Sequence, residues 1–222
     1  QEEIENIYSS LKTDIQLDWY QGSVPGPKFF QKSVIKDNVF KTEAGWFGEG
    51  VITPTHIKLK KAGTGLNIID NEFQGSLVLE NGMPSPETER GVGIQVIRTH
   101  LNVSDNNSFS ALYKGIDAYH LTNAVRQIHI TGNQFNRTLQ NITLTNGVFA
   151  KIIDNDFGSV NNNGGAEAWG IFAHNSAGLQ IIDNKFNCSA SLADANLDNL
   201  GIVLQHSGHY TNVISDNDFT GA

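Results

Sequence analysis

The sequence predicts an all-β fold, a right-handed, single-stranded parallel β-helix of about seven coils. Three observations predict it. A phrase of the form Ile-X-Asp-Asn-X-Phe recurs along the chain, a second phrase with alternating apolar residues precedes each copy, and the intervals suit one turn of a wide solenoid. The 222 residues, 39% hydrophobic and 17% charged, are enough for one domain with a substantial core.

The first phrase occurs seven times, for example as Ile152-Ile-Asp-Asn-Asp-Phe157 and Ile181-Ile-Asp-Asn-Lys-Phe186. Asn tolerates the left-handed backbone, and its amide can bond to the copy in the next coil, so we expect one stacked Asn at a turn of each coil. The intervals run from 22 residues (133 to 155) to 35 residues (71 to 106). The matching residues are Asn38, Asn71, Asn106, Asn133, Asn155, Asn184 and Asn217.

The second phrase predicts another strand, so that each coil has two recognisable strands. In the copy Gly115-Ile-Asp-Ala118, strict alternation places Ile116 and Ala118 inside the coil and Asp117 outside. The aliphatic residue before each repeated Asn and the Phe after it should form further inward columns. We therefore expect the core to consist of stacked aliphatic and aromatic residues.

These two phrases resemble the parallel β-helix repeats of the pectate-lyase-like superfamily, over residues 14–219. That superfamily includes polysaccharide lyases, polygalacturonase-type hydrolases, epimerases, phage tailspikes and non-catalytic bacterial surface proteins, so the resemblance implies the fold far more specifically than the activity. Polygalacturonase-type enzymes carry Asn-Thr-Asp, Asp-Asp and Gly-His-Gly segments. The nearest segment here is Ser207-Gly-His-Tyr210, which departs from that pattern.

Residues 14–222 are predicted to form the β-helix, as a piece of a longer protein. Residues 1–13 have two interpretations. Ile4, Ile7, Tyr8 and Leu11 share one helical face, which suits a short helix capping the first coil, but the same segment suits part of an earlier coil. At the other end nothing follows Phe219 to cover the last coil, so we expect end-to-end contact with further coils or with a partner protein.

The formal charge of −8 and the lack of a Lys/Arg cluster larger than Lys58, Lys60 and Lys61 argue against nucleic acid as a partner. No apolar run approaches the roughly 18 residues of a membrane span, so we expect no membrane insertion. Cys188 is the single cysteine, so neither a disulfide framework nor a Cys/His metal site is predicted.

A column of Asp residues directly before the repeated Asn offers oxygen ligands that suit Ca²⁺. The same residues are ordinary turn residues, and Gly132 interrupts the column, so no metal site is assigned. The column contains Asp37, Asp70, Asp105, Asp154, Asp183 and Asp216.

The connections after each Phe differ greatly in length, so insertions gather at one corner of the coils, where loops commonly carry binding specificity. Four aromatic residues on or beside these loops are candidates for binding a polysaccharide or a cell-surface glycan, although aromatic residues also cover the edges of such coils. They are Trp46, Phe47, Tyr113 and Trp169.

The outward face of the second strand carries the candidates for catalysis. A lyase acting on uronic acids needs a base for the C5 proton and a cation for the carboxylate. Arg98 with Tyr119 or a histidine has the right chemistry, whereas a hydrolase needs two carboxylates and the central coils offer only Asp117. Solvated polar residues on a sheet face explain the same set, which comprises Asp117, Tyr119, Arg98, His120 and His174.

Without a convincing acid/base pair, the leading prediction is a non-catalytic module of a secreted or cell-surface bacterial protein, serving as an adhesin, a stalk or a carbohydrate-binding surface. The alternative is a polysaccharide-active enzyme, a lyase or epimerase before a hydrolase. Its groove would lie on the outward sheet face beside the long loops.

Overall fold

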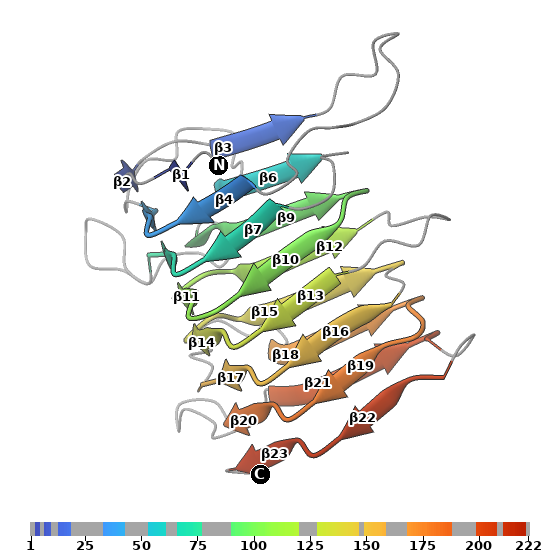
Figure 1. The fold of residues 1–222 in the computed structure, drawn as a ribbon. Helices are drawn as coiled ribbons and strands as arrows, with labels where there is room; N and C mark the ends of the chain where they lie inside the picture. The colour runs from blue at the N-terminus through green and yellow to red at the C-terminus, as the bar shows by residue number, and fades with distance from the viewer. Residues whose placement is uncertain are drawn as a thin grey trace, which may run out of the picture.

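The computed structural model shows strands stacked coil upon coil, as a parallel β-helix (Figure 1). It describes residues 3–4, 7–9, 13–18, 33–42, 53–60, 66–76, 90–119, 128–146, 149–158, 168–187, 199–207 and 211–220. These residues form three parallel sheets and no α-helix. The predicted fold class is therefore confirmed.

Sheets I and II each have eight strands, and sheet III has seven. Sheet I contains β1 (Glu3–Ile4), β4 (Ser33–Lys36), β7 (Leu66–Ile69), β10 (Leu101–Ser104), β13 (Ile128–Thr131), β16 (Ala150–Ile153), β19 (Gln180–Ile182) and β22 (Val213–Ser215). Sheet II contains β2 (Ile7–Ser9), β5 (Val39–Lys41), β8 (Glu72–Gln74), β11 (Ser108–Ser110), β14 (Gln134–Asn136), β17 (Asp156–Phe157), β20 (Lys185–Asn187) and β23 (Asp218–Thr220). Sheet III contains β3 (Thr13–Asp18), β6 (Thr55–Lys60), β9 (Val92–Ile97), β12 (Lys114–Tyr119), β15 (Gln140–Thr145), β18 (Ala168–His174) and β21 (Asn199–Gln205).

Each coil has three strands rather than the predicted two, because the first repeated phrase contains a corner. In the fifth full copy of that phrase, β16 ends at Ile153 and β17 begins at Asp156, with Asp154 and Asn155 between them. Each strand pairs in parallel with the strand three positions before it and the strand three positions after it, as β16 does with β13 and β19. One coil therefore contributes one strand to every sheet.

The first coil contains strands. A capping helix was one of two interpretations of this segment. β1 pairs with β4, with Ile4 opposite Ile35, and β2 pairs with β5, with Tyr8 opposite Phe40. The described part of residues 1–13 thus belongs to an earlier coil, and the helical interpretation is wrong. The sequence Ile4-Glu-Asn-Ile-Tyr8 is an eighth copy of the first phrase, shortened by one residue.

The corner between sheets I and II is made by a left-handed residue followed by the repeated Asn. The left-handed residue is the Asp, with φ between 53° and 57° in six coils, and Gly132 (φ 66°) takes its place in another. Of the seven Asn residues that the repeat singles out, only Asn106 (φ 62°) takes this conformation, so the left-handed position belongs to the residue before the Asn in the other coils. In the coil of β10 and β11 two residues, Asp105 and Asn106, are left-handed, so the stacked Asn there is Asn107 and not Asn106.

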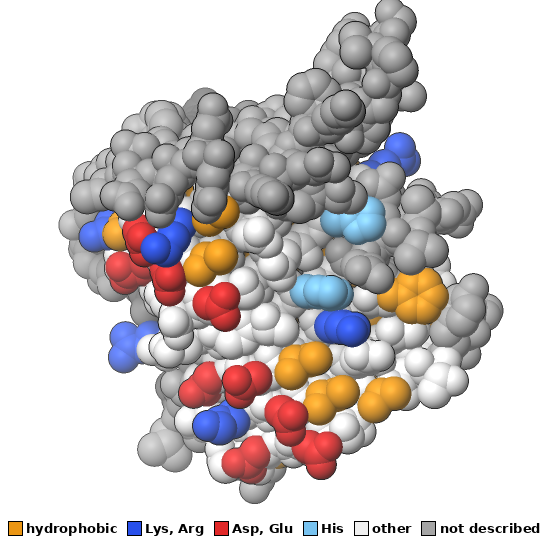
Figure 2. Space-filling model, viewed as in Figure 1, with side chains coloured by type: hydrophobic (Ala, Val, Ile, Leu, Met, Phe, Trp, Pro, Cys, Tyr) orange, Lys and Arg blue, Asp and Glu red, His pale blue; other side chains and the backbone are white. Residues whose placement is uncertain are grey.

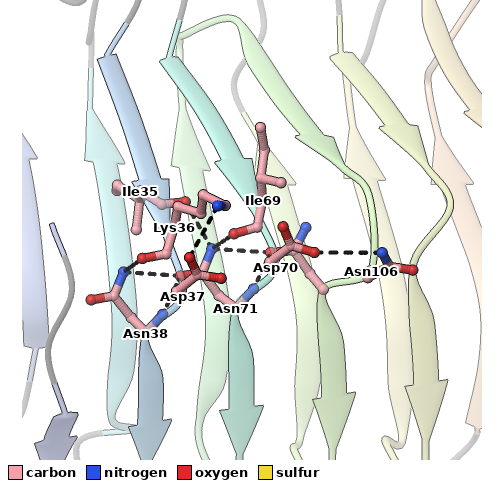
Figure 3. A network of polar contacts seen from close by, with 9 residues as sticks. Ile35, Lys36, Asp37, Asn38, Ile69, Asp70, Asn71 and Asn106 are labelled. Atoms are coloured by element: carbon pink, nitrogen blue, oxygen red, sulfur yellow. Dashed lines mark hydrogen bonds and ion pairs between the residues drawn. The ribbon is translucent and has the colours of Figure 1, made fainter. Parts of the chain in front are cut away.

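The repeated Asn residues form a continuous ladder, which is confirmed in Figure 3 for Asn38 and Asn71. In the middle of the ladder, the backbone N–H and Nδ2 of Asn155 both donate to Oδ1 of Asn184 at 3.0 Å. Nδ2 of Asn155 also donates to the carbonyls of Ile130 and Ile153. The side chains are buried, so these bonds satisfy polar groups that water cannot reach.

The Phe after each ladder Asn stacks on its counterparts in neighbouring coils. Ring centroids are 4.7 to 5.0 Å apart and the rings are nearly parallel. This spacing equals the distance between paired strands, and each stacked pair is worth about 0.5–1.5 kcal/mol beyond its buried area. The stack consists of Phe40, Phe73, Phe109, Phe135, Phe157, Phe186 and Phe219.

The sheet III strands β6, β9, β12, β15 and β18 each contain at least two successive buried residues, which breaks the strict alternation. In β12 both Gly115 and Ile116 are buried, between the half-buried Lys114 and Asp117. A Cβ on Gly115 would lie 2.8 Å from the Phe135 ring and 2.6 Å from the carbonyl oxygen of Asn141. Glycine is needed there because the chain passes so close to the Phe stack.

Replacing a ladder Asn should destabilise the fold far more than replacing its neighbour. In Asn133→Ala, the carbonyls of Val103 and Thr131 lose a donor, and Nδ2 of Asn107 loses one of its three acceptors. Each buried unsatisfied group costs about 1–3 kcal/mol, so we expect a loss of about 3 kcal/mol or more in the free energy of unfolding, measured by urea denaturation. The control is Gln134→Ala, at an exposed neighbouring amide, which should change it by less than about 0.5 kcal/mol. Equal losses in both variants would contradict the role given to the ladder.

Candidate binding face

The outward side chains of sheet III line up in columns because equivalent strands pair in register. Asp117 lies opposite Gln95 and Thr143, and Thr143 lies opposite Phe172. The next column contains Tyr119, Thr145, His174 and Gln205. Neighbouring members of a column are therefore about 4.8 Å apart along the stack, the distance between paired strands.

A third column lies on the same outward face, because two successive residues between it and the next column are both buried. Lys114 lies opposite Gln140, and Gln140 lies opposite Trp169. Strict alternation would put Lys114 and Asp117 on opposite faces, since their separation is odd. With Gly115 and Ile116 both buried, Lys114 and Asp117 share the outward face, and so do Trp169 and Phe172.

Lys114 and Asp117 form an ion pair, with Nζ 3.1 Å from Oδ1. The Lys114 ammonium also lies 5.8 Å from the centre of the Tyr113 ring, and that ring packs against the buried Leu139 and Ala168. Tyr113, a predicted ligand-binding residue, thus belongs partly to a small satellite core. The carboxylate of Asp117, a predicted catalytic residue, is engaged by a neighbouring cation.

Trp169 and Phe172 form an aromatic pair on the outward side of β18. Their ring centroids are 4.9 Å apart, with an interplanar angle of 32°. The indole Nε1 of Trp169 donates to Oγ1 of Thr143 at 3.3 Å, which orients the ring against the preceding strand. Both residues are half-buried, so part of each remains accessible to solvent. We call Trp169, Phe172 and Thr143 the aromatic platform.

Histidine and glutamine side chains continue the face towards β21. Nδ1 of His174 lies 3.1 Å from Oε1 of Gln205, and the rings of His174 and His206 meet edge to face with centroids 5.5 Å apart. His206 is exposed and left-handed (φ 52°), at the turn after β21. These groups can donate and accept hydrogen bonds beside the aromatic platform.

The predicted catalytic residues are only partly brought together. Arg98 is exposed in the turn after β9 and directly follows Ile97, whose Cα lies opposite Tyr119. His174 is two strands away from Tyr119, at about 10 Å along the stack. Among the other predicted residues, His120, Trp46 and Phe47 lie outside the described residues.

The pKa of the Tyr119 phenol is raised above its ordinary value of 10.0. Burial is the main cause, because it disfavours the phenolate, and the negative charge of Asp117 adds to it. Tyr119 therefore holds its proton at neutral pH and can donate a hydrogen bond. A general base needs the opposite shift.

The Asp column lies along the corner between sheets I and II, where Figure 2 shows acidic side chains gathered at one side of the molecule. Its members have local partners: Nζ of Lys36 lies 3.1 Å from Asp37, and Asn106 donates to Asp70 at 3.4 Å. No group of three or more His, Cys, Asp or Glu side chains within the described ranges is arranged to hold a metal ion. The Asp residues occupy the left-handed position of these turns.

Alternation along the second phrase predicts Thr143, Phe172 and Gln205 on this outward face, as the structure has them, but it misses Lys114. The repeated Gly-Ile before the outward position was a usable signal, because glycine marks a close approach to the core and two inward residues in a row.

Comparisons with known proteins leave the chain without a family assignment. It matches no protein-family model, and neither the curated proteins nor the solved structures include a match. The described residues also contain no helix long and apolar enough to cross a bilayer. The class that the fold defines is a parallel β-helix repeat protein, and function must be argued from the site.

The influence of Asp117 on Tyr119 predicts a measurable shift. In an ultraviolet titration of phenolate formation, the signal lost in Tyr119→Phe should titrate above pH 10.0 in the unmodified protein. Asp117→Asn should lower that pKa because it removes the nearby negative charge, whereas Asp105→Asn, at an exposed corner, should not. An unchanged titration in Asp117→Asn would refute the electrostatic coupling.

Proposed function

We propose that the protein is a non-catalytic β-helix module of a secreted or cell-surface protein, and that it binds an extended glycan along the outward face of sheet III. The observation that carries the proposal is the aromatic platform on β18, where Trp169 and Phe172 stand 4.9 Å apart beside polar columns. Aromatic rings with polar neighbours suit sugars, which present apolar C–H faces and hydroxyl edges.

The regular spacing of the columns supports a polymeric ligand. Equivalent positions recur about every 4.8 Å, which is close to the length of one pyranose residue, so successive sugars can meet successive strands. Donors and acceptors line the column beside the platform, which runs from Tyr119 through Thr145 and His174 to Gln205. A sheet holds these groups rigidly, which reduces the entropic cost of binding.

The chemistry of the face favours binding over catalysis. Among the described outward side chains of the sheet III strands from β6 to β21, Asp117 is the sole carboxylate, and it is paired with Lys114 at 3.1 Å. A glycosidase needs two carboxylates across the scissile bond. The raised pKa of Tyr119 disfavours the phenolate that a lyase base would require.

A polysaccharide lyase or epimerase is the second candidate. It is supported by the resemblance to the pectate-lyase-like superfamily and by the position of Arg98, one residue beyond the partner of Tyr119. In such an enzyme Arg98 would neutralise a uronate carboxylate, and its groove would lie beside the same columns. Both candidates use the outward face of sheet III, so one set of variants separates them.

Binding should be measured by isothermal titration calorimetry against a panel of neutral and acidic polysaccharides. For a bound polymer, Trp169→Ala and Phe172→Ala should each weaken binding at least about tenfold, which corresponds to roughly 1.4 kcal/mol. Ile182→Ala removes an outward apolar side chain from sheet I and is the matched control. Equal weakening by the control, or binding by none of the panel, would contradict the proposed face.

The same panel should be assayed for new reducing ends and unsaturated products. We expect none, because the face lacks an acid/base pair. Cleavage that is lost in Arg98→Ala and Tyr119→Phe but kept in Ile182→Ala would establish the lyase alternative instead.

A further inference from the structure

The outward face of sheet I carries a different chemistry in each of three neighbouring columns, because its strands pair in register. The first column is rich in N–H donors and contains Asn67, Asn102, His129, Lys151 and Gln180. The central column contains Ile69, Ser104, Thr131, Ile153 and Ile182. The third column lies at the corner that follows and contains Asp70, Asp105, Gly132, Asp154 and Asp183. We call this surface the striped face.

Figure 2 shows the striped face, since sheet I lies towards the viewer as in Figure 1. Acidic side chains gather to the left of the hydrophobic ones, and Lys and His side chains lie to the right. Lys151, Asp154 and Asp183 are exposed, and none of them forms an ion pair with another residue that the structure describes. Their charges are therefore available to a partner molecule.

The donor column and the acidic column match each other coil by coil. Among the coils of β7 to β19, the one without a carboxylate has Gly132 at its corner, and its donor-column residue is His129. The pKa of His129 is lowered, mainly because burial disfavours the imidazolium and also because of the charge of Lys151. The ring is therefore neutral at pH 7. In the next coil the charged Lys151 precedes Asp154 on the same strand and corner.

We propose that the striped face binds the same face of a second copy of this chain, about a two-fold axis parallel to the stack. Such a rotation keeps each coil at its own height and exchanges the two outer columns across the central one. The donor column of one copy then faces the acidic column of the other, so Lys151 meets the partner's Asp154. Ile153 and Ile182 lie near the axis and face their own equivalents.

The orientation of the axis follows from the order of the columns. A two-fold axis running across the strands would set each column against itself and bring the carboxylates of the two copies together. Like charges placed opposite one another cost several kcal/mol. The parallel axis instead gives an apolar centre with polar groups on both sides, which is the usual composition of a protein interface.

The size of the striped face sets the expected strength of the contact. Four intervals of about 4.8 Å separate the five strands from β7 to β19, so the face is about 19 Å long. A contact of this length is at the small end of specific interfaces, so we expect a dissociation constant in the micromolar range or weaker. An isologous contact of this kind uses up the face in both copies, so association stops at the dimer.

The test is the molar mass of the chain measured by sedimentation velocity at concentrations up to about 1 mM, where a dimer of this affinity is populated. Lys151→Glu would place two carboxylates opposite each other and should weaken dimerisation at least about tenfold. Asp154→Arg should do the same by placing two cations together. The left-handed corner accepts arginine, since Arg98 and Arg137 take φ values of 55° and 54°.

The double variant Lys151→Glu with Asp154→Arg restores opposite charges across the axis and should dimerise within about threefold of the unmodified chain. The matched control is Lys41→Glu, which makes the same charge change at an exposed position of β5 in sheet II and should leave dimerisation unchanged. Circular dichroism will verify that each variant is folded. If Asp154→Arg is not folded, Lys151→Glu and its control still test the contact.

Several results would overturn the proposal. A chain that stays monomeric up to about 1 mM would leave the striped face to a different partner. Growth beyond the dimer would contradict an isologous contact. Stronger association in Lys151→Glu would indicate that the column faces itself, and equal weakening by Lys41→Glu, or a folded double variant that does not recover, would exclude the pairing of these columns. Sheet III faces away from this contact, so none of these results depends on glycan binding.

Discussion

The asparagines inside the ladder each tie three coils together at the corner between sheets I and II. Asn133 accepts a hydrogen bond from Nδ2 of Asn107 in one coil and donates to Oδ1 of Asn155 in the other. Since the amide reaches both neighbours only at the spacing of paired strands, the ladder fixes the rise of the solenoid. The stacking of the Phe rings and the alignment of the sheet III columns both follow from that rise. The left-handed Asp before each Asn lets the chain turn sharply enough to bring the amide into place.

The fold could be predicted because residues of the same type recur at the same place in every coil and contact one another in the stack. An invariant Asn and Phe at a fixed offset can be stacked only if the coils are in register, which is the definition of a parallel solenoid. The number of strands per coil was harder to predict. A phrase of six or seven residues reads as one strand until a left-handed residue is placed in its middle, and Asp is only mildly favoured there. The sequence Asp105-Asn-Asn107 has two Asn residues, so the ladder position was assigned to the wrong one. The extra residue lies in the turn, where both Asp105 and Asn106 are left-handed.

The candidate face could be predicted in part. Asp117, Tyr119 and His174 lie outward as alternation requires, whereas Lys114 and Trp169 join them only because two inward residues precede the outward position. That departure depends on the Phe stack passing close behind the glycine, a tertiary contact that strict alternation leaves out and that only the repeated glycine indicates. Because of this break in alternation, Lys114 and Asp117 lie on the same face and form an ion pair. The carboxylate of Asp117 is therefore paired with a cation rather than available as a general acid or base.

The hydrogen bonds at this corner also affect how readily the ladder asparagines deamidate. Asparagine deamidates when the backbone nitrogen of the next residue attacks the side-chain carbonyl carbon and closes a succinimide ring. At the ladder this nitrogen is already committed: the N–H of Asp156, which follows Asn155, donates to the carbonyl of Asn133 at 2.9 Å, and the N–H of Lys185, which follows Asn184, donates to the carbonyl of Asn155 at 2.9 Å. The side-chain amide is held in place as well. Closure of the succinimide ring would require both the backbone N–H and the side-chain amide to be released from their hydrogen bonds. The buried asparagines of the ladder should therefore deamidate slowly.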